Sequence, residues 1–216
     1  MKYHIQTAPI WDAYKTTDGC PLCELYKARQ TRLVTQYLTD NVMDPDFRVA
    51  SNSRGFCAEH IKQMYAGQNK LGLALQLETR AAALNELIKS APADKKSAKK
   101  LSEKLNNHRG CVICDTLDEV MPRYYMTVAQ MFDNEKDFPE LFADAKHCLK
   151  HAQHLFAVAE YAGKSMAAYL RTLTDGIKRD LSTTEKELKA FADCFDFKSG
   201  TRPDASAIPR AIDLLN

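Results

Sequence analysis

Apolar residues recur along much of this chain at steps of three and four residues, the period of an amphipathic helix. The clearest case is the series Leu155, Ala159, Ala162, Met166, Tyr169, Leu173 and Ile177. It predicts one helix running from about Cys148 to about Ile177. The same period marks Ile113, Leu117, Val120, Tyr124 and Val128. These patterns predict an all-α fold.

The first part of the chain follows a similar plan. Leu22, Tyr26, Leu33 and Tyr37 share one helical face, which predicts a helix from Cys23 to about Thr39. A second helix is expected from about Cys57 to about Lys89, with apolar residues on two faces that pack between neighbours. Between them, residues 41–55 contain Pro45 and several turn-forming residues, and we expect an irregular connection there.

Several local signals predict where helices begin or end. Pro122 falls inside a helical pattern and predicts a kink or break before Arg123. Residues 138–145 are expected to form a short connecting piece. The residues Ser182 to Glu185 fit a capping box, which predicts the start of a last helix with Phe191 and Phe195 facing inward. The tail from Ser199 contains two prolines and is expected to be extended.

A pair of short cysteine motifs occurs twice. In the first half a CxxC motif precedes a CxxH motif, and in the second half each of these residues recurs 91 positions later. The residues are Cys20, Cys23, Cys57 and His60, then Cys111, Cys114, Cys148 and His151. One CxxC motif arises easily by chance, but two identically spaced sets do not. We therefore interpret all eight residues as metal ligands.

The same offset relates residues that are not ligands, among them Phe47 and Phe138, and Gly72 and Gly163. A glycine inside a helix costs about 1 kcal/mol relative to alanine, so its repetition predicts a close helix crossing at both positions. We expect an internally duplicated helical bundle whose halves are related by a pseudo-twofold axis and pack as one unit. The expected parts are a first repeat (1–90), a basic linker (91–108), a second repeat (109–181) and a C-terminal helix with its tail (182–216).

The ligand types favour zinc. Zinc prefers four ligands in a tetrahedron, and three thiolates with one imidazole make a closed structural set. A CxxH motif at a helix start places two ligands on one face, and the helix N-terminus lowers the pKa of thiols there. We assume that each half closes its own site, so that two zinc ions bind per chain. The spacing fits a swapped arrangement equally well, with Cys20 and Cys23 meeting Cys148 and His151.

Other interpretations of the cysteines stay open. An iron–sulfur cluster with one histidine ligand, a thiol pair of the thioredoxin type, and reduced core cysteines without metal are alternatives. Covalent haem is disfavoured because Glu24 and Asp115, not histidine, follow the CxxC motifs. His108, His147 and His154 are candidate supporting or substitute ligands, or solvent-facing residues. Cys194 has no counterpart in the repeat and is interpreted as a core thiol.

Composition adds limits on partners and location. The chain has 216 residues and a net charge of +2, so no overall field attracts it to nucleic acid or to an anionic membrane. The lysines of residues 95–104 are interpreted as a solvated face, and nucleic-acid binding is considered a minority alternative. No apolar run approaches the roughly 18 residues of a spanning helix, and the start lacks a secretory signal. We expect a cytoplasmic protein with no membrane association.

The N-terminal segment holds the only tryptophan, Trp11. We interpret residues 1–19 as an apolar strap packed on the helices. A pocket formed by His4, Asp12 and Tyr14 is the alternative.

The chain resembles a known sequence family. The segments that carry the resemblance are Met1 to His4, Trp11 to Tyr14, Cys20 to Cys23, Gly55 to His60 and Leu71 to Ala74. They are similar to an uncharacterised bacterial family, a domain of unknown function with two CxxC…CxxH motifs. The resemblance covers most of the chain. It implies a bacterial cytoplasmic setting and shared cysteine motifs, and it implies no catalytic residues.

These observations favour a non-enzymatic zinc protein that serves as an interaction or regulatory module. Its partner is not identified by the sequence; another protein and a second copy of the chain are the two options. The chain contains no phosphate-binding loop, no GxSxG and no HExxH motif, which disfavours an enzyme. The alternatives are a thiol-redox or metal-responsive switch, an enzyme with a catalytic zinc, a nucleic-acid-binding protein and an iron–sulfur protein.

Overall fold

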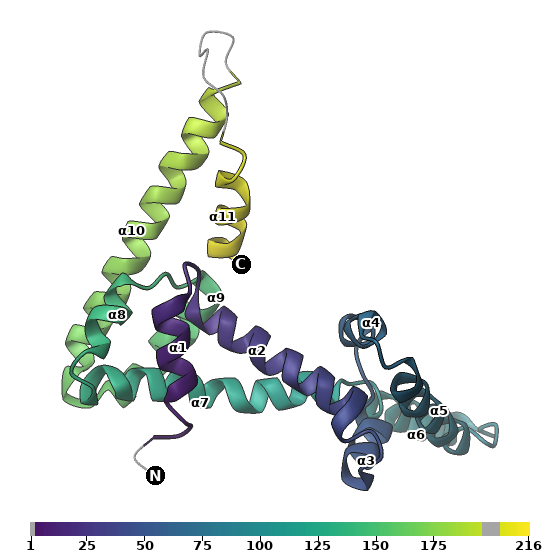
Figure 1. Ribbon diagram of the computed structural model, residues 1–216. Helices are drawn as coiled ribbons and strands as arrows, with labels where there is room; N and C mark the ends of the chain where they lie inside the picture. Colours follow the sequence, from purple (N-terminus) through teal and green to yellow (C-terminus); the bar gives the residue numbers. More distant parts are fainter. Residues whose placement is uncertain (1–2, 196–203) are drawn as a thin grey trace. The chain divides into compact units, whose positions relative to one another are not determined.

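The computed structural model describes residues 3–195 and 204–216, and all regular secondary structure in these ranges is helical (Figure 1). The prediction of an all-α fold is therefore confirmed. The chain divides into two compact units. We call Met1–Lys27 with Val120–Asn216 the terminal unit, and Ala28–Glu119 the central unit. These units do not follow the sequential halves expected from the repeat, because the central unit takes residues from both of them.

The terminal unit contains α1 and the start of α2, then most of α7 and every later helix. In chain order the bounds are α1 Ala8–Thr16, α2 Pro21–Thr35, α7 Val112–Asn134, α8 Phe138–Asp144, α9 Leu149–Ala157, the 3-10 helix η2 Ala159–Ser165, α10 Met166–Asp193 and α11 Ala207–Leu215. Helices α2 and α7 contribute residues to both units.

One apolar core holds the terminal unit together. Its largest fully buried side chains are Tyr169, Phe138 and Phe142. Tyr169 also donates its hydroxyl to the Leu155 carbonyl oxygen at 3.0 Å, so that its one polar group is satisfied. Helix α1 buries Ile10, Ala13 and Tyr14 in this core, as the interpretation of an N-terminal apolar strap predicts.

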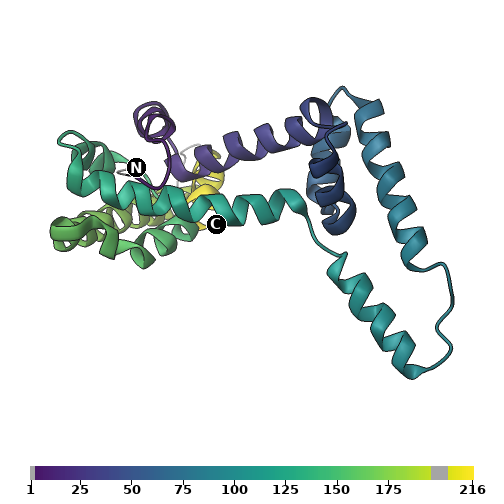
Figure 2. The same cartoon turned by 90° about the horizontal axis from the view of Figure 1, so that it is seen from below.

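The central unit contains the rest of α2 and the helices up to the start of α7. Its other elements are the π-helix η1 Gln36–Asp40, α3 Pro45–Arg54, α4 Ala58–Ala66, α5 Lys70–Leu87 and α6 Lys95–Asn107. Helix α3 packs against α5, and Gln76 of α5 is fully buried where Ser51 donates to it at 2.7 Å. Figure 2 shows α5 and α6 joined by residues 88–94, so the basic linker is largely helical.

The prediction of an irregular connection over residues 41–55 is wrong, because α3 occupies most of it. Pro45 stands at the first helical position, where its missing N–H is no loss. Asp44 caps the helix by accepting from the amides of Asp46 and Phe47. Residues 138–145, predicted to be a short connecting piece, likewise form a helix. This helix, α8, begins at Phe138, and Pro139 lies in its first turn.

Two other helix boundaries differ from prediction. Of the kink or break predicted at Pro122, the break does not occur, because α7 continues through Pro122 and Arg123. The helix tolerates the proline because only one main-chain hydrogen bond is lost, while Met121 and Tyr125 beside it stay buried. In the first half, the expected helix 57–89 is divided into α4 and α5 around Gly67.

The C-terminal region also differs. Helix α10 runs through Ser182 to Glu185, so these residues do not cap a new helix, and Phe195 is 67% exposed. The start of the tail lies outside the described residues. Residues 207–215 form α11 rather than an extended strand, and α11 packs against α10 by burying Ala207, Ala211 and Leu214 (Figure 1).

The two repeated glycines both lie at close approaches, but only Gly72 is inside an α-helix. A Cβ on Gly72 in α5 would lie 2.1 Å from the Leu38 carbonyl oxygen. Gly163 has a φ of +51° in the 3-10 helix η2, so the helix predicted from Cys148 to Ile177 is interrupted there.

None of the helices in residues 3–195 and 204–216 combines the length and the apolar character that a membrane-spanning helix needs.

Candidate metal centres

All eight predicted ligands gather into two groups of four, but the groups exchange partners between the halves. The terminal group is Cys20, Cys23, Cys148 and His151, and the central group is Cys57, His60, Cys111 and Cys114. In each group the four donor atoms lie within 4.8 Å of one another. The assumption that each half closes its own site is therefore wrong, and the swapped arrangement is the one observed. Each group lies within one compact unit.

In the terminal group the His151 Nδ1 atom faces three sulfur atoms. It lies 3.2 Å from Cys148 Sγ, 3.4 Å from Cys23 Sγ and 3.5 Å from Cys20 Sγ. The sulfurs of Cys23 and Cys148 are 3.7 Å apart, far longer than a disulfide bond of about 2.05 Å.

The central group has the same form. The His60 Nδ1 atom lies 3.1 Å from Cys111 Sγ, 3.2 Å from Cys57 Sγ and 3.4 Å from Cys114 Sγ. The Cys57 and Cys114 sulfurs are 3.9 Å apart. A tetrahedral ion with metal–sulfur bonds of about 2.3 Å and a metal–nitrogen bond of about 2.0 Å separates its ligands by about 3.5–3.8 Å. Both groups therefore fit one tetrahedral ion.

Helix starts position the ligands in both groups. Cys57 and Cys148 are the N-cap residues of α4 and α9, so that the histidine three residues later falls on the same side of the first turn. The CxxC motifs sit at the starts of α2 and α7. In the first of them the Cys23 amide donates to the Cys20 carbonyl oxygen at 3.0 Å, which forms the tight turn that brings both sulfurs to one side.

The electrostatics favour anionic sulfur at the two N-cap cysteines. Hydrogen bonds from Cys20 and Cys23 lower the pKa of the Cys148 thiol, and the His151 backbone amide adds to this. Burial acts to raise the pKa of the Cys57 thiol, but hydrogen bonds from the His60 backbone amide, the Cys111 and Cys114 thiols and the Glu59 backbone amide together outweigh it, and the pKa is lowered. A thiolate is the form that binds a metal ion, so this shift prepares both groups for one.

Arginine side chains brace the segment that leads into the second CxxC motif. Arg54 donates to both carboxylate oxygens of Asp115, at 2.6 and 2.9 Å, and to the Asn107 carbonyl oxygen at 3.3 Å. Arg80 donates to the carbonyl oxygen of His108. Main-chain bonds from Gly110 to Arg54 and from Val112 to Gly55, both 3.0 Å, add to the brace. This network holds the central group in place.

The terminal group is surrounded by aromatic rings instead. The buried His147 hydrogen bonds to the Tyr14 hydroxyl at 3.0 Å, and burial lowers the pKa of His147 to about 4. The ring of His154 stacks on Tyr125 at 4.8 Å. His108 pairs with Arg80 at 3.1 Å. None of these histidines, nor the half-buried Cys194, belongs to either donor group within the described residues.

The outer nitrogens of the two candidate ligand histidines differ. The Nε2 atom of His60 lies 2.9 Å from the side-chain amide of Gln30. The Nε2 atom of His151 is buried and has no hydrogen-bond partner in the described residues. Sequence reasoning did not find Gln30 or the arginine brace, because a polar residue on a helix carries no signal of what it will face.

The family whose sequence pattern matches residues 1–216 is described as "Family of unknown function (DUF6062)". No curated protein and no solved structure matches the chain.

Proposed function

The chain belongs to the family of unknown function DUF6062, and we propose that it is a zinc-binding helical module in which each Cys3His group holds one structural ion. The observation that carries the proposal is the convergence of four protein donors at both places. A closed set of four leaves no position for a water molecule, which a catalytic zinc requires. The donor-atom distances of 3.1–3.9 Å match the ligand separations around one tetrahedral ion and support this proposal. A cluster of several iron atoms needs its thiolates farther apart.

The proposed role of the ions is to join parts of the chain that are distant in sequence. His151 follows Cys20 by 131 residues, and a bond between them through a metal closes a long loop. Such a closure stabilises the folded state because it removes conformational freedom from the unfolded chain. In this proposal, zinc completes the core of each unit.

The structural ions require a direct test. Metal analysis of the purified, reduced protein is expected to find two zinc ions per chain. X-ray absorption is expected to find three sulfur ligands and one nitrogen ligand per zinc. Absence of metal from folded protein contradicts the proposal, and an oxygen ligand in the first coordination shell revives a catalytic zinc.

Helix boundaries support an internal duplication as part of this proposal. Helix α4 spans Ala58–Ala66 and α9 spans Leu149–Ala157, so both ends are offset by the same 91 residues as the ligands. Helices α2 and α7 begin at Pro21 and Val112, again with this offset. We propose that one ancestral unit was duplicated, and that in the folded chain the CxxC motif of each copy pairs with the CxxH motif of the other copy.

The interaction role is proposed from an apolar helix face. Ile208, Ile212 and Leu215 follow one another at helical spacing on α11, and all three are about half exposed. Exposed apolar faces of this kind are typical of association sites. Self-association is tested by sedimentation of the wild type and of Ile212→Asp. A concentration-dependent dimer that the substitution abolishes supports association between copies, and a monomer at all concentrations excludes it.

A thiol-redox switch is the second candidate, and the exposure of sulfur ligands favours it. Cys20, Cys23, Cys57 and Cys114 are only partly buried. Hydrogen peroxide can oxidise two such thiolates to a disulfide, with the peroxide reduced to water and zinc released. The test is titration with peroxide while zinc release is followed with a colour indicator. Release at low, stoichiometric peroxide supports the switch, and zinc that stays bound until the chain unfolds supports a purely structural role.

A further inference from the structure

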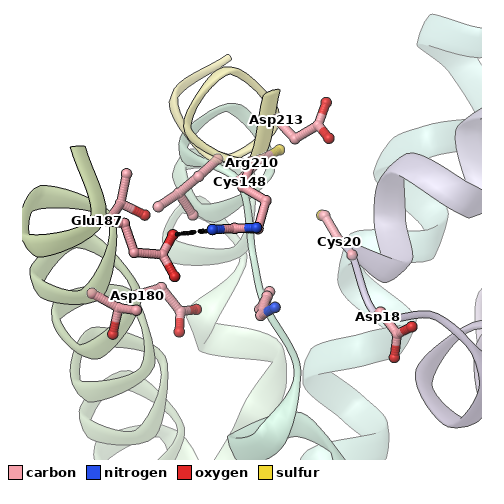
Figure 3. A pocket seen from close by; sticks show the side chains of 12 residues that line it. Asp18, Cys20, Cys148, Asp180, Glu187, Arg210 and Asp213 are labelled. Carbon is pink, nitrogen blue, oxygen red and sulfur yellow. Dashed lines mark hydrogen bonds and ion pairs between the residues drawn. The ribbon is translucent and has the colours of Figure 1, made fainter. Parts of the chain in front are cut away.

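A cavity of about 360 Å³, with several charged side chains in its lining, adjoins the terminal group (Figure 3). Helix α10 forms one wall with Asp180, Thr183, Thr184 and Glu187, and α11 forms another with Arg210, Asp213 and Leu214. The remaining lining residues are Asp18, Gly19, Lys146 and the two ligand cysteines Cys20 and Cys148. This volume lies in the range of small-molecule sites in proteins.

The charge of the cavity is negative. Four carboxylates line it, from Asp18, Asp180, Glu187 and Asp213, against two cations, Lys146 and Arg210. Two of the carboxylates are in ion pairs, Glu187 with Arg210 at 3.1 Å and Asp180 with Arg179 at 3.0 Å, and Arg210 also donates to Asp204 at 3.0 Å. The excess negative charge of the lining therefore comes from Asp18 and Asp213, against Lys146. Figure 3 shows Asp180 and Glu187 projecting from α10 toward the side of the cavity that carries Asp18 and Cys20. A cleft whose lining carries an excess of negative charge attracts cations and raises their local concentration.

Asp180 leaves one buried hydrogen-bond acceptor without a partner. Its side chain is only 11% exposed, and its Oδ1 atom accepts from Arg179 Nε at 3.0 Å. Its Oδ2 atom is buried and has no hydrogen-bond partner among the described residues. Such an atom destabilises the protein unless a ligand or water binds it. Beside it, the Thr183 hydroxyl donates to the Arg179 carbonyl oxygen at 2.9 Å, which leaves the Thr183 oxygen as an acceptor.

The surroundings of the central group have the opposite charge, although its ligands correspond one to one. Its neighbouring pocket is lined by Arg54, Arg80 and Arg109, with Asp115 as the single carboxylate. At the common offset, Arg109 corresponds to Asp18 and Arg54 to Ala145. Of the two bracing arginines, Arg54 therefore has no arginine counterpart at the terminal group, while Arg80 corresponds to Arg171, which does not line the acidic cavity. The metal ligands alone do not require this difference.

We infer that the cavity beside the terminal group binds a small organic cation carrying a primary amine, with the ammonium group held by Asp180 and its apolar part lying against Leu214. An ammonium group has three donors and no acceptor, which matches carboxylate and hydroxyl oxygens that lack donors. The inference goes beyond the proposed function and does not depend on bound zinc, because the carboxylates of α10, α11 and residue 18 supply the charge.

The test is calorimetric titration of the full chain with putrescine, n-butylamine and, as an anion of similar length, succinate. Saturable binding of at least one amine at one site per chain is expected, and no binding of succinate. Asp180→Asn is expected to weaken amine binding about tenfold or more, because it removes a hydrogen bond to a charged group. Asp175→Asn, on the exposed face of the same helix and outside the cavity, is the matched control and is expected to change nothing.

Two further measurements separate the outcomes. Asp213→Asn changes an exposed residue of the cavity, so it tests the site even if Asp180→Asn fails to fold, and it is expected to weaken binding about threefold. Zinc content is measured for every variant, so that loss of metal is recorded separately from loss of amine binding. The inference is overturned if neither amine binds, if succinate binds equally well, or if no cavity variant changes amine binding.

Discussion

The sulfur atoms of Cys23 and Cys148 lie 3.7 Å apart, although 125 residues separate them in the chain. Their proximity shows that the CxxC motif of the first half meets the CxxH motif of the second. The reverse pairing occurs in the central group, where Cys57 and Cys114 come within 3.9 Å. A metal ion in either group therefore joins the two halves of the sequence.

This pairing predicts which cysteine substitutions act on the same ion. Cys23→Ser and Cys148→Ser are each expected to lower the zinc content from two ions per chain to one, and the double variant is expected to keep one. Cys23→Ser combined with Cys57→Ser is expected to lose both, because these cysteines belong to different groups. Metal analysis of the purified variants measures this directly.

The matched control is Cys194→Ser, which lies outside both groups and is expected to keep two ions. If the combination of Cys23→Ser and Cys57→Ser retained one ion while that of Cys23→Ser and Cys148→Ser lost both, each half would close its own site and the observed pairing would be wrong.

The contact between Gln30 and His60 predicts a difference in affinity between the two groups. When Nδ1 of His60 faces the sulfurs, its Nε2 atom carries the proton. The Gln30 amide nitrogen lies 2.9 Å from this Nε2 atom, and turning the amide group by 180° presents the carbonyl oxygen as the acceptor. Gln30→Met, which introduces the residue found 91 positions later at Met121, removes this acceptor. We expect the affinity of the central group for zinc to fall about 10- to 100-fold.

The measurement is competition with a coloured chelator, in which the two zinc ions are removed separately. One of the two is expected to leave more readily from the variant, and the other is expected to behave as in the wild type. The control is Gln68→Met, which makes the same glutamine-to-methionine change at an exposed position. Equal weakening of both ions would show that Gln30 acts on the fold rather than on His60.

Two glycines in long helices are predicted to respond to alanine in opposite directions. A Cβ at Gly72 meets the Leu38 carbonyl oxygen at 2.1 Å, whereas a Cβ at Gly176 meets only the end of the Arg179 side chain, at 3.9 Å. Gly72→Ala is expected to lower the free energy of unfolding by about 2–4 kcal/mol, since the backbone must move. Gly176→Ala is expected to raise it by about 0.5–1 kcal/mol through helix propensity. Thermal unfolding of the metal-loaded variants checks both signs. A stabilising Gly72→Ala would show that α5 and the π-helix η1, which carries Leu38, are not in close contact.

The ligands and the helical class were predictable from the sequence because both rest on local patterns. Structural zinc sets consist mostly of cysteine and histidine, often in pairs at short spacings, and buried helix faces repeat every three to four residues. The pairing of His151 with Cys20 rather than with Cys111 was not predictable, because the two halves have identical spacing. Only the packing of distant helices decides between the two closures.

The helix boundaries that were wrong share one physical reason. Proline signals a break, yet Pro45 stands at a first helical position and Pro122 lies in a helix held by buried neighbours on both sides. Ser182 to Glu185 match a capping pattern but lie in the middle of α10. In each case the helix boundary is decided by tertiary packing and by the position of the residue within the helix. Neither can be read from the local sequence pattern.

Tyr169 predicts how stability depends on pH at the alkaline end. Its side chain is fully buried and donates to the Leu155 carbonyl oxygen, and burial raises the pKa of Tyr169 above its ordinary value of about 10. In the unfolded chain the hydroxyl ionises at its ordinary pKa, so above pH 10 the unfolded state loses a proton that the folded state keeps. The contribution of Tyr169 is therefore fully present below pH 10 and is lost as the pH rises beyond it.

Tyr169→Phe tests this dependence. At pH 7 the variant is expected to be about 1 kcal/mol less stable, because the hydrogen bond to Leu155 is lost. Above pH 10 the wild type is expected to lose about 1.4 kcal/mol per pH unit relative to the variant, so that the difference reverses sign by about pH 11, since phenylalanine cannot ionise. Denaturant unfolding of the metal-loaded proteins at pH 7, 10 and 11 measures it, with Tyr65→Phe as the control because Tyr65 is 67% exposed. A difference that stays constant from pH 7 to 11 would mean that Tyr169 ionises in the folded protein as readily as in the unfolded chain, and that the aromatic core around it admits water.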